Sequence, residues 1–112
     1  MGGAPLVGCR ASYALGMRRR AIERKLRQVG SRLKSLREEV RIADEQLAAL
    51  RDEADDMSIR ALVAETSHAG IEARHAQGHA DAMAKHRAHV VAQIAELERT
   101  QDQLLDALTS AT

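Results

Sequence analysis

The chain has 112 residues, of which 45% are hydrophobic, and a formal net charge of +1. Phe and Trp are absent and Tyr13 is the only aromatic residue, a composition that is very unusual for a packed sheet or sandwich. The mixture of Ala, Leu, Arg, Glu and Asp is instead typical of long helices and coiled coils. We therefore expect an all-α protein that is not an enzyme, because most catalytic folds bury a larger core. We also expect no cofactor and no small-molecule substrate.

The near-zero net charge hides a strong segregation of charge along the chain. Residues 18–41 carry ten basic and three acidic side chains, whereas residues 42–66 carry two basic and seven acidic ones. No run of eighteen apolar residues occurs, which excludes a membrane-spanning helix. Cys9 is the single cysteine, so no intramolecular disulfide forms and a cytoplasmic location is expected.

The first residues differ in composition from all that follow. Residues 1–16 contain four of the seven glycines and the only proline, cysteine and tyrosine. This composition predicts a disordered tail over residues 1–17. An alternative is that translation starts at Met17. In either case we expect the helical domain to span residues 18–112.

Apolar residues recur along the first half with alternating steps of four and three, which is a strong coiled-coil signal. This first seam comprises Ile22, Leu26, Val29, Leu33, Leu36, Val40, Ala43, Leu47, Leu50, Ala54, Met57 and Ala61. The repeat of 3.5 residues implies a left-handed supercoil with at least one other helix. It predicts a first helix over about residues 18–65.

A second seam follows in a different phase. It comprises Ala69, Ala73, Ala76, Ala80, Met83, Arg87, Val90, Ile94, Leu97, Gln101, Leu104 and Leu108. The change of phase indicates that the chain turns, most simply at residues 66–70, where Thr66 or Ser67 can cap a second helix over about 71–110 and Gly70 can relax the backbone. Residues 55–58 are a competing turn, and Gly78 is a third.

An antiparallel two-helix coiled-coil hairpin accounts for both seams. A turn near residue 68 lays Arg87 and its basic neighbours beside the acidic run 44–56, so charges of opposite sign favour this register. A lone helix pair with an alanine-rich contact buries little surface, which predicts self-association into a helical bundle, most simply a homodimer. The polar seam residues Arg87 and Gln101 are expected to fix register.

Part of the chain resembles small uncharacterised coiled-coil proteins of high-GC actinobacteria. The resemblance lies in residues 51–87, in DEADD, RALVAET and HADAMAKHR. The use of fourteen Arg against three Lys, without any Asn, fits such a source. The resemblance implies a helix start just after Glu65 and Thr66, although Ser67 stands where such proteins carry proline. It implies no catalytic or binding residue.

Basic residues at the start of the first helix are a candidate polyanion site. The residues are Arg18, Arg19, Arg20, Arg24, Lys25 and Arg27, and the cluster continues to Arg32 and Lys34. Such a cluster can neutralise the phosphates of a nucleic acid or of anionic lipid. The alternative is a solvated helix face that pairs with acidic residues of the same chain.

All five histidines lie between residues 68 and 89. Four of them fall within about 40° of one another on a helix, at 100° per residue. His75 and His79, at positions i and i+4, have the spacing of a helical metal-binding pair. A pH-sensitive interface and an ordinary solvated surface are the alternatives.

These features predict a non-enzymatic coiled-coil interaction or scaffold protein that acts through protein–protein contacts. Its partner is a second copy or another protein. The alternative is an accessory protein that binds RNA or the ribosome through the basic segment. The candidate interface residues are Leu26, Val29, Leu33, Leu36, Val40, Leu47, Leu50, Val90, Ile94, Leu97, Leu104 and Leu108.

Overall fold

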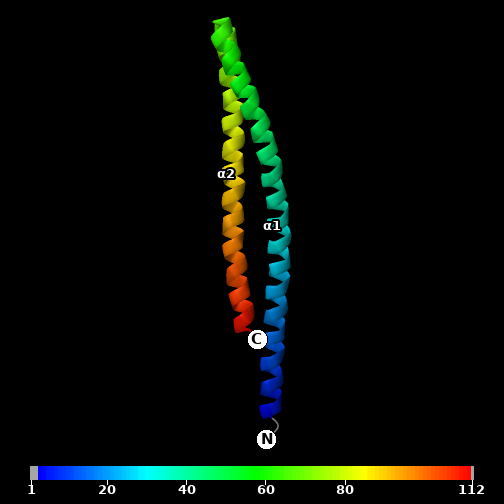
Figure 1. Ribbon diagram of the computed structural model, residues 1–112. Helices are drawn as coiled ribbons and strands as arrows, with labels where there is room; N and C mark the ends of the chain where they lie inside the picture. Colours follow the sequence, from blue (N-terminus) through cyan, green and yellow to red (C-terminus); the bar gives the residue numbers. More distant parts are fainter. Residues whose placement is uncertain (1–2, 112) are drawn as a thin grey trace. The chain divides into compact units, whose positions relative to one another are not determined.

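The structure, a computed structural model, describes the backbone of residues 3–111 and the side chains of residues 14–111. It consists of two helices, α1 (Gly3–Ala64) and α2 (Ser67–Ser110) (Figure 1). The helices pack against each other, so the predicted all-α antiparallel hairpin is confirmed. None of the helices in the described part of the chain is long and apolar enough to cross a membrane.

Helix α1 begins earlier than the sequence analysis expects. It starts at Gly3, within the segment for which a disordered tail is predicted. Pro5 lies in its first turn, where a missing N–H costs no hydrogen bond, and no further proline interrupts the helix. Residues 1 and 2 of the expected tail lie outside the described residues.

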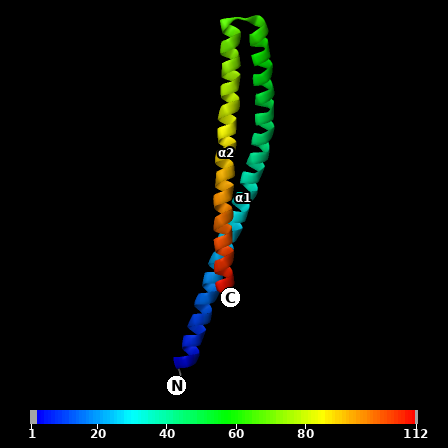
Figure 2. The same ribbon diagram turned by 60° about the vertical axis from the view of Figure 1, so that its left-hand side comes forward.

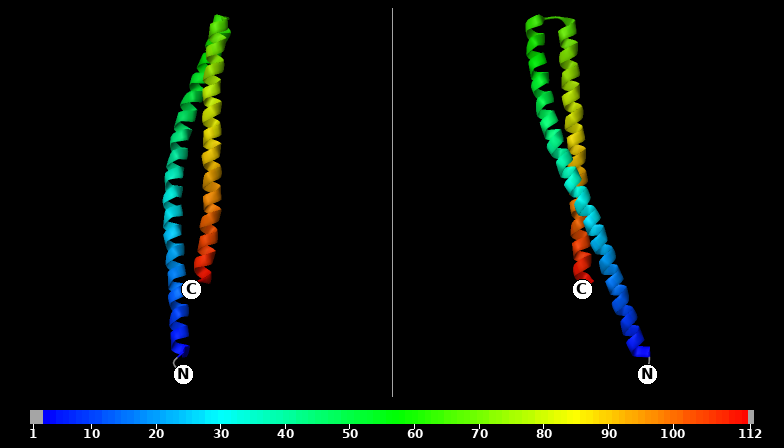
Figure 3. Two further views of the ribbon diagram at one scale, coloured as in Figure 1. Left: turned by 180° about the vertical axis from the view of Figure 1, so that it is seen from behind. Right: turned by 90° about the vertical axis from the view of Figure 1, so that its right-hand side faces the viewer.

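Contacts divide the chain into two compact units. The terminal unit combines Met1–Ser35 with Ala95–Thr112, and the turn unit is Leu36–Ile94. In the terminal unit, α1 runs alongside the last turns of α2 and extends beyond them (Figure 1; Figure 3). In the turn unit, α1 and α2 lie side by side and are joined at one end (Figure 2).

The turn consists of Glu65 and Thr66 and is shorter than the predicted turn over residues 66–70. Glu65 has a φ of 53°, in the left-handed region, and its N–H donates to the carbonyl of Ala61 at 3.0 Å. Thr66 caps α2, because its Oγ1 accepts a hydrogen bond from the N–H of Ala69 at 3.2 Å. The capping role predicted for Thr66 or Ser67 therefore belongs to Thr66.

The other predicted turn features lie inside helices. Residues 55–58 belong to α1, and Gly78 belongs to α2. Gly70 also lies in α2 with an ordinary helical φ, so the expectation that it relaxes the turn is wrong. Asp55 and Asp56 do not cap a helix because the first seam continues past them to Ala61, and ending α1 there would expose its last residues.

Every position of the two seams is buried or half-buried. The most fully buried residues are Leu33, Leu36, Ala43, Ala54, Ala80 and Val90. Leu33 belongs to the terminal unit, and the others belong to the turn unit. The core is therefore a thin layer of aliphatic side chains between two helices, and alanines supply much of it in the turn unit.

Replacing Glu65 by glycine should raise the free energy of unfolding by about 1 kcal/mol. A side chain in the left-handed region clashes with its own backbone, and glycine avoids this cost. Urea denaturation followed by circular dichroism measures the change. Glu53→Gly, an exposed change within α1, is the control and should destabilise the protein. A loss of stability in both variants would contradict the assignment of Glu65 as the left-handed residue.

Candidate interaction surfaces

Two polar side-chain pairs connect α1 and α2 in the turn unit. Arg87 Nε donates a hydrogen bond to Asp44 Oδ1, and His86 Nε2 lies 3.3 Å from Glu39 Oε1. Arg87 occupies a half-buried seam position, from which its guanidinium reaches the neighbouring helix. The predicted proximity of Arg87 to the acidic run of α1 is thus observed, with Asp44 as its partner.

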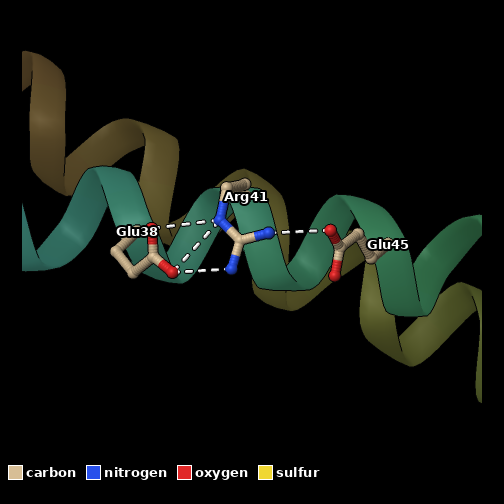
Figure 4. Close-up of polar contacts among 3 residues, drawn as sticks. All are labelled: Glu38, Arg41 and Glu45. Carbon is tan, nitrogen blue, oxygen red and sulfur yellow. Dashed lines mark hydrogen bonds and ion pairs between the residues drawn. The ribbon is translucent and has the colours of Figure 1, made fainter.

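A second polar cluster lies within α1. Arg41 donates from Nη2 to Glu38 Oε1 and from Nη1 to Glu45 Oε1, both at 2.7 Å (Figure 4). The hydrogen bond from Arg41 lowers the pKa of Glu38, and the same contact raises the pKa of Arg41. A lowered carboxyl pKa adds stability at pH values above the ordinary pKa of glutamate, and this contribution is lost as the pH falls through the folded-state value. Because all three side chains are exposed, the contribution is small.

The six predicted polyanion-binding residues are all exposed on α1 of the terminal unit. Arg19 is ion-paired with Glu23 at 3.1 Å on the next turn. An open groove further along the same helix gathers two of these six residues with Arg32, which continues the predicted cluster, and with three polar residues that the prediction did not include. It is lined by Arg24, Arg27, Gln28, Ser31, Arg32 and Ser35, which we call the arginine face.

The arginine face lies away from the core. At 100° per residue its members span about 140° of α1 and face away from Val29 and Leu33. Val29 and Leu33 are buried, whereas the three arginines are exposed. In the sequence, the arginine face falls within an interval, from Arg24 to Arg37, that contains no Asp or Glu.

His75 and His79 are exposed on α2 in the turn unit. They line an open groove together with Met57, Ala76 and two carboxylate residues, Glu53 of α1 and Glu72 of α2. Among the described residues, no three His, Cys, Asp or Glu side chains are arranged to hold a metal ion. Metal binding by the His75 and His79 pair therefore stays a prediction.

Two other histidines lie beside carboxylates. His86 lies near Glu39, and His68 Nε2 lies 3.0 Å from Glu72 Oε1. Each of these two imidazoles therefore has a carboxylate as its neighbour. The pH-sensitive interface therefore stays a prediction.

Large apolar side chains are exposed at the end of α1, next to the turn. Ile59, Leu62 and Val63, which we call the turn patch, are 62%, 78% and 81% exposed. At 100° per residue they lie within about 100° of one another, on the side of α1 opposite Met57 and Ala61. The turn patch is not part of the predicted seam, and its signal in the sequence is the spacing of apolar residues at i, i+3 and i+4 outside that seam.

Comparison of the chain with protein-family models, with curated proteins and with solved structures gave no match.

Proposed function

We propose that the protein is a non-enzymatic interaction module that acts through protein–protein contacts, with a second copy of the chain as its partner. The observation that carries the proposal is the turn patch. Three large aliphatic side chains within five residues are mostly exposed there, while the seam of the same helix is covered. Exposed apolar clusters of this kind are typical of protein–protein contact sites.

The turn patch is not covered by α2. Met57 and Ala61 point toward the core and are half-buried, so the opposite side of α1 faces away from α2. Arg60, within the patch segment, is already ion-paired with Asp56 at 3.0 Å. Apposition of two turn patches would remove six aliphatic side chains from water.

The exposed area of the chain supports self-association. The chain exposes 8364 Å² of surface. A globular monomer of the same mass, 12.2 kDa, exposes about 6,000 Å². Large homodimer interfaces bury about 2,000 to 5,000 Å² in total, or about 1,000 to 2,500 Å² of each chain, and the upper end of this range is similar to the excess. A dimer would therefore bring the buried fraction of the chain closer to that of stable domains.

A role in binding rather than catalysis fits the position of the reactive side chains. His75, His79 and the carboxylates near them lie at open grooves, where water competes for every polar contact. A cytoplasmic location is part of the same proposal, since a chain with a single cysteine gains no intramolecular disulfide from an oxidising compartment.

Sedimentation velocity tests the proposal. The wild-type chain should sediment as a dimer at micromolar concentration, and the double variant Leu62→Gln with Val63→Gln should sediment as a folded monomer. Glutamine keeps a high helix propensity, so the change removes apolar surface while α1 is retained.

The matched control is the double variant Ile42→Gln with Val91→Gln, at two exposed apolar positions of the turn unit that are 41% and 40% exposed. It should remain dimeric. A folded wild-type monomer would overturn self-association. A dimer that survives in the turn-patch variant but dissociates in the control would place the interface elsewhere.

A further inference from the structure

The arginine face combines three properties of a phosphate-binding surface, and the first is its donor chemistry. Arg24, Arg27 and Arg32 carry planar guanidinium groups, which bind phosphate oxygens in bidentate geometry. Gln28, Ser31 and Ser35, on the same open groove, add amide and hydroxyl donors. All six side chains therefore have a donor to offer an anion.

The second property is the absence of acidic side chains from this stretch of α1. No Asp or Glu occurs between Glu23 and Glu38, and Glu23 is ion-paired with Arg19 at 3.1 Å. Arg24, Arg27 and Arg32 form no ion pair with any residue in the described part of the chain. Their positive charge is thus presented to solvent.

The third property is length. From Arg24 to Ser35 the face covers about 16 Å of helix axis, at 1.5 Å per residue. A nucleic-acid duplex carries about one phosphate per 1.7 Å of its axis, so a face of this length meets several phosphates. The three arginines can therefore contact separate phosphates at the same time.

The same face argues against a membrane surface as the ligand. Interfacial helices bury large apolar side chains next to their basic ones. The arginine face has no apolar member, and the nearest large apolar residues, Val29 and Leu33, are buried against the hairpin. Binding must therefore rely on phosphate contacts alone.

We propose that the arginine face binds the phosphate backbone of a nucleic-acid duplex. None of its residues is aromatic, so it offers no side chain to stack on bases. Recognition is therefore independent of base sequence, and DNA and RNA share the chemistry. The surface is distinct from the turn patch, so its test is independent of self-association.

Fluorescence anisotropy with a labelled DNA duplex of about 20 base pairs, and with the RNA duplex of the same sequence, tests the proposal. Three phosphate contacts give a slope of about −2.7 in a plot of log affinity against log salt concentration. The wild-type affinity should therefore fall about 40-fold between 50 and 200 mM salt.

The test variant combines Arg24→Gln, Arg27→Gln and Arg32→Gln. It should bind at least about 10-fold more weakly at 50 mM salt, and its salt slope should become about 2.7 less steep. The control combines Arg51→Gln, Arg74→Gln and Arg99→Gln, three exposed arginines outside the face, with the same change of net charge. The control should bind almost as tightly as the wild type.

Equal losses in the two triple variants would overturn the proposal, because net charge alone would then explain binding. An unchanged salt slope in the test variant would also overturn it. So would tight binding to phosphatidylserine vesicles without binding to either duplex. If circular dichroism shows that the triple variant is unfolded, the single variants decide, and each should reduce the slope by about 0.9.

Discussion

Replacing Leu36 by alanine will lower the free energy of unfolding by about 2 to 5 kcal/mol. Leu36 is only 1% exposed and is among the largest fully buried side chains of the chain. The substitution removes apolar contacts and leaves a cavity in a core that is one layer thick. A typical domain has a free energy of unfolding of only about 5 to 15 kcal/mol, so this substitution removes a large fraction of it.

Urea denaturation followed by circular dichroism measures this loss. The control is Leu105→Ala, which makes the same chemical change at a position that is 47% exposed on α2. It should cost well below half as much, since part of that side chain already contacts water. Equal losses at the two positions would show that Leu36 is not in a closed core.

Replacing Ala80 by leucine will destabilise the turn unit by about 1 to 3 kcal/mol. Ala80 is 2% exposed in α2, and Ala54 of α1 is 1% exposed in the same unit. Two buried alanines on facing seams indicate that the helices approach closely there. A leucine at position 80 must push the helices apart or adopt a strained rotamer.

Thermal melts measure this effect, and Ala82→Leu is the control. Ala82 lies two residues away on the same helix and is exposed, so a leucine there meets solvent. The helix propensity of leucine is close to that of alanine, so the melting temperature of the Ala82→Leu variant should change little. A stabilising effect of Ala80→Leu would mean that a cavity adjoins Ala80 and that the helices are less closely packed than the burial indicates.

The heptad pattern by itself determined the helical class and the buried face of each helix. Leu33, Ala54 and Val90 are buried where the steps of three and four place them. This agreement has a local cause, since the helical repeat fixes which residues share a face whatever the partner is. The basic segment is exposed for the same reason, because its charged residues fall outside the seam.

The position of the turn depended on both local and tertiary factors. Thr66, Ser67 and residues 55–58 all have capping side chains, so local chemistry left several turns possible. The structure selects Glu65 and Thr66, where α1 has completed its seam at Ala61 and the seam of α2 begins at Ala69. Pairing of the two seams, together with the cap that Thr66 provides, is consistent with this position of the turn.

Only the tertiary structure decided which of the remaining side chains stay in contact with water. Ile59, Leu62 and Val63 have the same aliphatic character as the seam residues, yet they are the most exposed large apolar residues of the described chain. Whether such a side chain is covered depends on which face of α1 receives α2, and one helix can cover only one face.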